Sequence, residues 1–118
     1  MSSPAVDQAT AQLLKAIRET DTYISYTQLK ESVLSDAVNQ MLLERFVRAQ
    51  SQLQLAAFAG VAASDEDTAN FEYLSGLVYQ SEEMTDYLLA QMRVQQLVAK
   101  TMSTISQEVG LDVNLPEL

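Results

Sequence analysis

The 118-residue chain contains neither cysteine nor histidine. Without cysteine there can be no disulfide, zinc–thiolate site, iron–sulfur ligation or thiol nucleophile. Without histidine the chain lacks the commonest general base and the commonest transition-metal ligand. We therefore expect no catalytic residue, no metal site and no cofactor.

Basic residues are also scarce. Seven Lys and Arg stand against sixteen Asp and Glu, which gives a net charge of −9 and a pI near 4.2. Nucleic acids and anionic lipid surfaces are bound through Lys and Arg, so direct binding to either is disfavoured. No stretch approaches the ~20 apolar residues of a membrane span, and the first residues do not resemble a signal peptide. The expected location is the cytoplasm.

Helix breakers are few and stand near the ends or at expected turns: Pro4, Pro116, Gly60, Gly76 and Gly110. There is no β-branched run and no Asn-Gly or Asp-Gly hairpin turn, so strands are not expected. Apolar residues make up 47% of the chain, enough for a hydrophobic core. These features predict a single all-α domain over residues 1–118, with 111–118 as a short C-terminal tail.

Small polar residues precede each apolar run, at the position where a helix needs an N-cap. Five helices are expected: one from Pro4 capped by Ser3, one over about 22–34 after Thr20 or Asp21, one from Ser35-Asp36 to about Ala59, one from Ser64-Asp65 to near Gln80, and one over 82–109 after Ser81. The first helix has an apolar stripe that we expect to be buried: Val6, Ala9, Leu13, Ala16 and Ile17.

The stretch from Glu82 to Val109 has the most regular apolar pattern. It contains no Gly or Pro, and its apolar residues recur every three or four positions, as on one face of a helix. Such a helix is about 40 Å long. A compact globule of this length has a radius of gyration of only about 13 Å, so the pattern predicts an elongated antiparallel bundle.

An internal similarity at an offset of 46 relates residues 35–43 to residues 81–89. It suggests a lead helix followed by two short-then-long helical hairpins. The alternative is that any two amphipathic helices with a serine cap look alike.

The acidic clusters do not form a recognisable chemical motif. Counted from Asp65, the sixth position is Asn70 and the twelfth is Gly76, so the EF-hand pattern fails. Glu82, Glu83 and Asp86 lie at a helix start, where the helix dipole favours acids. No Gly-rich phosphate loop is present. An enzyme is not expected.

The long helix is the strongest candidate for an interaction surface. Its apolar residues lie on more than one face, which indicates burial from more than one side, and one neighbour is expected to be a second subunit. We therefore predict a homo-oligomer, a dimer or higher. Gln95, if buried, would fix the register of the pairing. The candidate interface residues are Met84, Leu88, Met92, Gln95, Val98, Met102 and Ile105.

The tyrosine and methionine residues fall mostly at helical spacing and are expected to pack in the core. A methionine-rich groove for a partner helix is one alternative. Another is a small-molecule-binding helical bundle with a Tyr/Met-lined pocket.

Several packing patterns resemble the YlbF/YmcA family of small bacterial helical proteins, over about residues 6–109. They are Ile17-x-x-Thr20-x-x-Tyr23-x-x-Tyr26, Leu34-x-Asp36, Leu43-x-x-Phe46 with Gln50, and Tyr87-Leu88-x-Ala90-x-x-x-Val94-x-Gln96-Leu97. The family often has Asn-Pro where Ser81-Glu82 stands here, and some members end in a Cys-rich tail that this chain lacks.

The resemblance implies a non-enzymatic regulatory or adaptor protein that self-associates and acts through helix-mediated contacts with other proteins. Family members are regulators of competence, sporulation and biofilm formation. Some act with a further partner that modulates ribonuclease Y and can carry iron–sulfur clusters. RNA-decay machinery is therefore a possible partner class, whereas the cluster chemistry does not carry over because the chain has no cysteine.

Overall fold

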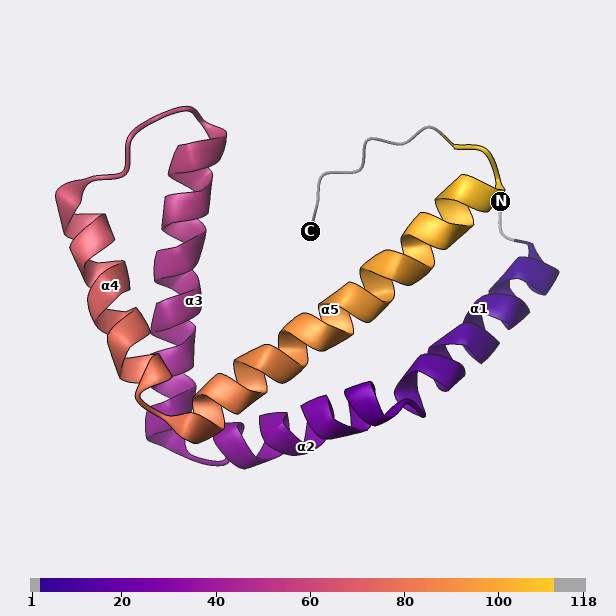
Figure 1. Cartoon of the computed structure of the whole chain (residues 1–118), viewed down its shortest axis with the longest axis horizontal. Coiled ribbons are helices and arrows are strands. Elements are labelled where there is room, and N and C mark those ends of the chain that lie inside the picture. The colour runs from indigo at the N-terminus through magenta and orange to yellow at the C-terminus, as the bar shows by residue number, and fades with distance from the viewer. Residues whose placement is uncertain (1–2, 112–118) are drawn as a thin grey trace. The chain divides into compact units, whose positions relative to one another are not determined.

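The computed structural model describes residues 3–111, and within this range the chain forms five α-helices and no strand (Figure 1). The helices are α1 Pro4–Arg18, α2 Asp21–Leu34, α3 Ala37–Phe58, α4 Asp65–Tyr79 and α5 Glu82–Glu108. The all-α prediction is confirmed, and the expected boundaries agree to within a few residues. The predicted tail at 111–118 lies, apart from Leu111, outside the described residues.

Four of the helix starts are capped by the expected residues. In each, a side-chain hydroxyl accepts a hydrogen bond from a backbone N–H one turn on, which satisfies a donor that the helix itself leaves unpaired. The pairs are Ser3 with Val6, Thr20 with Tyr23, Ser64 with Asp67 and Ser81 with Met84.

The cap of α3 differs from the expected one. Asp36 is the N-cap, and its Oδ1 accepts from the N–H groups of Val38 at 2.8 Å and Asn39 at 3.3 Å. The Ser35 hydroxyl instead donates to the carbonyl of Ser32 at 2.7 Å. A carboxylate at this position bonds two N–H groups and also favours the positive end of the helix dipole.

Two glycines end the long helices as expected. Gly60 and Gly110 have φ values of 71° and 73°, a conformation that costs glycine little. After α3, the N–H of Val61 bonds the carbonyl of Ala56 at 2.9 Å. This is the 6→1 bond of a Schellman motif, which fixes the direction in which the chain leaves the helix.

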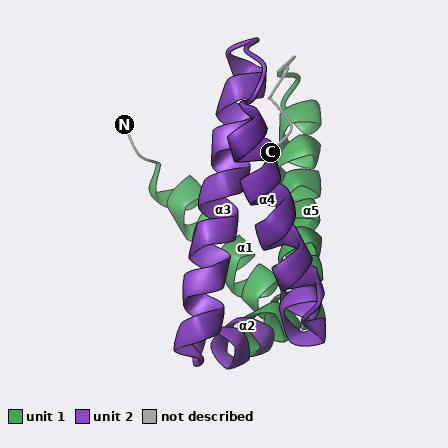
Figure 2. Cartoon of the chain, turned by 90° about the vertical axis from the view of Figure 1, so that its left-hand side faces the viewer, with its two compact units in different colours: residues 1–28, 88–118 green, residues 29–87 purple. Residues whose placement is uncertain are grey.

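The chain divides into two compact units (Figure 2). Unit 1 comprises residues 1–28 and 88–118, and so contains α1, the first half of α2 and most of α5. Unit 2 comprises residues 29–87, with the end of α2, all of α3 and α4, and the first turns of α5. The expectation of a single domain stays a prediction.

Unit 2 holds most of the buried core. Helices α3 and α4 run antiparallel and pack closely (Figures 1 and 2). The Phe46 ring stacks on Phe71 with centroids 5.5 Å apart and meets the edge of Tyr79 at 6.2 Å. The buried apolar residues of this unit are Val33, Leu43, Phe46, Ala49, Leu74, Val78, Met84 and Tyr87.

The lengths of α2 to α5 alternate between short and long, at 14, 22, 15 and 27 residues, as expected. The close packing of α3 on α4, however, joins the long helix of the first expected hairpin to the short helix of the second. The internal similarity also fails in its burial pattern. At the offset of 46, buried Phe46 corresponds to Met92, which is 48% exposed. The serines that the two segments share also differ in role, since Ser81 caps α5 whereas Ser35 does not cap α3.

Unit 1 buries very little. Within its described residues only Ala90 is buried, and α1 contains no buried residue at all. The expected burial of the α1 stripe is therefore wrong for the single chain: Ile17 is half-buried, and Val6, Ala9, Leu13 and Ala16 are exposed. The amphipathic pattern is present, but within residues 3–111 it is covered only in part, near Ile17.

The aromatic contact in unit 2 can be tested by truncation. Phe46→Ala removes a 4% exposed ring from between α3 and α4, and we expect it to cost about 3–5 kcal/mol in the free energy of unfolding. Val47→Ala, at a neighbouring side chain that is 52% exposed, should cost less than about 1 kcal/mol. Urea titrations followed by circular dichroism measure both. An equal loss of unfolding free energy in the two variants would show that Phe46 does not anchor this core.

Candidate interaction surface

Unit 1 exposes a large set of apolar side chains. Eleven large ones are between 36% and 63% exposed: Val6, Leu13, Leu14, Ile24, Leu89, Met92, Val98, Met102, Ile105, Val109 and Leu111. Scattered single hydrophobic residues are ordinary on a protein surface, but contiguous apolar stripes on helices mark interaction sites.

The α5 helix presents two apolar faces and one polar face. On the covered face Tyr87 and Ala90 are buried and Val94 and Leu97 are half-buried, at the spacing of successive helical turns. A second apolar stripe on α5 is exposed. Since a helix turns by about 100° per residue, this stripe lies roughly a quarter turn around the helix from the first. The polar face carries Arg93, Gln96, Lys100, Ser103 and Gln107.

Most of the candidate interface residues lie on this second stripe. Met92, Gln95, Val98, Met102 and Ile105 are exposed, and we call these five residues the α5 stripe. Leu88 is half-buried. Met84 is only 4% exposed, so its own chain already covers it and it is not available on the surface.

The interface predicted from the sequence lies on α5 alone and does not include α1. That helix carries further exposed apolar side chains, Val6, Leu13 and Leu14. The signal was present, since the α1 stripe is periodic, but periodicity shows that a face is apolar and not which molecule covers it.

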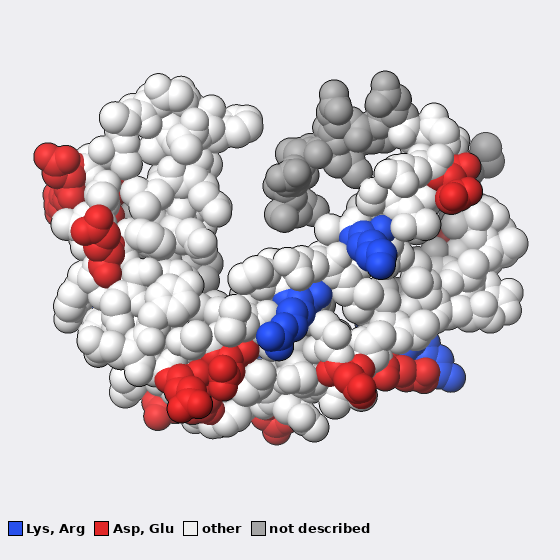
Figure 3. All heavy atoms as spheres, in the orientation of Figure 1, with Lys and Arg blue, Asp and Glu red and all other residues white. Residues whose placement is uncertain are grey.

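Charge is distributed unevenly between the units. The described part of unit 1 has four acidic and four basic residues, a balance of zero. Unit 2 has ten acidic and three basic residues, a balance of −7. In the view of Figure 3 the basic side chains lie over α1 and α5, within unit 1. The exposed apolar surface of unit 1 therefore belongs to a part of the chain with no net charge.

The described range contains no buried polar cluster. Between residues 3 and 111 no polar or charged residue is buried, and no group of acidic residues is placed to hold a metal ion. In the same range none of the helices combines the length and apolar character that crossing a membrane requires. Among the aromatic and sulfur side chains, Tyr73, Tyr79, Met41, Met92 and Met102 are exposed and so do not line a common interior.

What this arrangement offers chemically is apolar contact. The hydroxyls of Thr10, Thr101 and Thr104 bond backbone carbonyls one turn back on their own helices, so they are engaged locally. Within unit 2 the Ser32 hydroxyl donates a hydrogen bond to the Glu83 carboxylate, which joins two segments that are distant in the sequence. It ties the end of α2 to the start of α5.

Two curated relatives are bacterial UPF0342 proteins. The chain is 28% identical to the one from Halothermothrix orenii over 83 residues, which are 70% of each chain. It is 26% identical to the one from Symbiobacterium thermophilum over 104 residues, covering 88% of this chain and 91% of that protein.

Two solved structures share the fold. A DUF964 protein of unknown function from Bacillus stearothermophilus matches with a TM-score of 0.74 at 15% identity, over 90% of this chain and 93% of that one. Bacillus subtilis RicA, solved in complex with RicF, matches with a TM-score of 0.64 at 15% identity, over 92% of this chain and 96% of that one.

The family comparison agrees with the resemblance read from the packing patterns. The family model described as "Control of competence regulator ComK, YlbF/YmcA" matches residues 6–110, which include all five helices except the first two residues of α1. The chain therefore belongs to the YlbF/YmcA family of competence-control proteins.

Proposed function

We propose that this protein is a non-enzymatic helical adaptor of the cytoplasm that self-associates through unit 1 and acts by contact with other regulatory proteins. The observation that supports self-association most strongly is that α1 is an amphipathic helix with no buried residue. Isolated helices of this length are marginal in water and gain stability from packing an apolar face. A second copy of unit 1 supplies such a face.

The exposed apolar area is large enough for a stable pairing. The eleven large apolar side chains of unit 1, at roughly half exposure, present on the order of 900 Å². A standard protein–protein interface buries about 800 Å² on each partner. The summed exposed apolar area of unit 1 is thus of the same order as one side of a standard dimer interface, although Leu89 lies on the polar face of α5.

Charge favours the same surface. The chain carries −9 overall, so two copies repel when they approach at random. Because the described part of unit 1 has no net charge, pairing through unit 1 avoids bringing the acidic units into contact. A dimer formed through unit 2 would bring together two units that each carry a net charge of −7.

The regulatory part of the proposal comes from the family. Its description concerns control of a competence regulator, and RicA, which has a similar fold, was solved in complex with RicF. We extend this to the present chain as a role in a multi-protein regulatory assembly. The family resemblance further implies that such an assembly acts on competence, sporulation or biofilm formation and modulates ribonuclease Y.

The α5 stripe provides the direct test of self-association. Met102→Asp places a charge in the middle of the proposed interface, and we expect it to weaken the dimer by about 30-fold or more, since desolvating an unpaired carboxylate is costly. Met92→Asp should act in the same way. Leu88→Asp is less clean, because Leu88 is half-buried in the single chain and the change also affects folding.

The matched control is Val38→Asp, which adds the same charge at a 65% exposed residue of unit 2. Light scattering coupled to size exclusion over a range of concentrations gives the molar mass. We expect the unmodified chain and Val38→Asp to dimerise alike. A strict monomer for the unmodified chain at high concentration rules out self-association, and a Met102→Asp variant that dimerises normally rules out this face.

Gln95 tests the same interface without adding charge. It is the polar residue in the apolar α5 stripe, and a polar residue at such a position sets register at a cost in stability. We expect Gln95→Leu to tighten self-association by about tenfold. Gln107→Leu, on the polar face of the same helix, should leave it unchanged. Sedimentation velocity compares the two variants, and equal behaviour would show that Gln95 stays in water in the assembly.

A further inference from the structure

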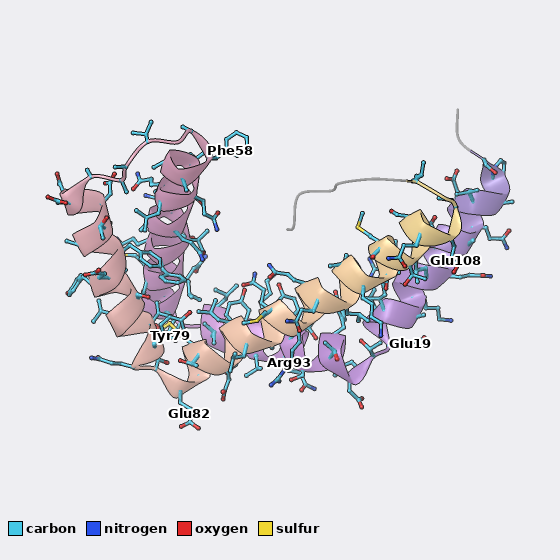
Figure 4. The ribbon with its side chains drawn as sticks, turned by 45° about the horizontal axis from the view of Figure 1, so that its top comes forward. Glu19, Phe58, Tyr79, Glu82, Arg93 and Glu108 are labelled. Atoms are coloured by element: carbon cyan, nitrogen blue, oxygen red, sulfur yellow. The ribbon has the colours of Figure 1, made fainter. Side chains whose placement is uncertain are left out.

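The end of the α3–α4 hairpin is an exposed apolar surface distinct from unit 1. We define the hairpin tip as residues 55–64. The exposed fraction is 93% for Phe58, 68% for Leu55 and 63% for Val61. Figure 4 shows the Phe58 ring projecting beyond the end of α3. Burial within the chain therefore gives the Phe58 ring almost no stabilisation.

The tip is held in place by its backbone. The N–H of Gly60 bonds the Ala57 carbonyl at 3.2 Å and that of Val61 bonds the Ala56 carbonyl at 2.9 Å, which completes the Schellman motif. Phe58 is the last residue of α3 and lies inside this bonded turn. The ring is presented from a regular helix end, so little backbone entropy is lost when something binds it.

Charged residues follow the hairpin tip in the sequence but do not precede it closely. Residues 49–64 contain no charged side chain, although they lie in the unit whose balance is −7. Asp65, Glu66 and Asp67 follow in the first turn of α4. In Figure 3 acidic side chains stand along the outer edge of the hairpin, below an uncoloured tip. The complementary surface is apolar at its centre and basic at its rim.

The area of the tip decides between possible occupants. Its three large side chains present on the order of 400 Å², about half of what a stable dimer buries on each partner. A second copy docked tip to tip would gain this small area while bringing two acidic units together. A membrane surface rich in anionic lipid is repelled by the same acids. A concave protein surface, in contrast, encloses a projecting ring and pairs with the acids.

We propose that the hairpin tip is a second docking surface, which inserts Phe58 into an apolar cleft of a partner protein rimmed by Lys and Arg. An aromatic side chain in a desolvated pocket is a common hot spot of binding, and the acidic edge contributes mainly to the rate and specificity of association. This surface consists of residues of unit 2 and shares none with the self-association surface proposed for unit 1.

A fluorescein-labelled peptide that folds as a helical hairpin tests the proposal. Its sequence, of about 40 residues, has leucines lining the groove between its two helices and lysines along both edges, which reproduces an apolar cleft with a basic rim. Fluorescence anisotropy measures its binding to the full chain. We expect Phe58→Asp to weaken binding by about tenfold and binding to fall as NaCl rises from about 50 to about 500 mM.

The matched control is Tyr73→Asp, at a 66% exposed aromatic residue on α4 of the same unit. Both variants carry the same added charge, so a difference between them reports the ring at the tip and not the net charge. Phe58→Asp should lower the thermal midpoint only slightly, because the ring is almost fully exposed and the cost is limited to a carboxylate in the last turn of α3.

Three results would overturn the proposal. Equal weakening by both variants would show that the peptide binds the acidic surface alone. Loss of self-association in Phe58→Asp would show that the occupant is a second copy. Binding of phosphatidylcholine vesicles that depends on Phe58, without any effect on the peptide, would assign the tip to a lipid surface. The light-scattering mass of Met102→Asp tests the proposal for unit 1 separately.

Discussion

An amphipathic helix has to cover its apolar face, and this constraint governs unit 1. Its helix α1 has no buried residue, and among the described residues of the unit only Ala90 is buried. Unit 2 covers part of its apolar surface within the chain, because Phe46 packs between α3 and α4 against Phe71 and Tyr79, although the hairpin tip stays exposed. The two units thus differ in how their apolar surface is covered, and the proposed self-association follows from that difference.

The sequence predicts local structure well because caps and stop signals are local. Ser3, Ser64 and Ser81 cap the helices they precede, and Gly60 and Gly110 end α3 and α5. Pairing between helices is harder to predict, since it depends on which faces meet. The regular stripe of α5 predicts an interface at Met92 and Met102, whereas the face that the chain itself covers is the one with Ala90 and Val94. Both faces are apolar, so periodicity alone does not rank them.

The residues that carry the family resemblance help to separate these faces. On α5, Tyr87, Ala90, Val94 and Leu97 all belong to the motif and lie on the covered face. The exposed α5 stripe is outside the motif, and so is the hairpin tip with Phe58. The shared fold is therefore encoded in one set of positions, while the surfaces proposed for binding lie in another. An uncharged run such as residues 49–64 is visible in the sequence, but its exposure is visible only in the structure.

The central claim is that α1 is stabilised by a second copy of the chain. Hydrogen–deuterium exchange of the α1 amides, measured over a range of protein concentrations, tests it most directly. The account predicts that protection of α1 rises with concentration in step with the fraction of dimer, while protection of α3 at Phe46 stays constant. Strong protection of α1 at concentrations where the chain is monomeric would contradict it.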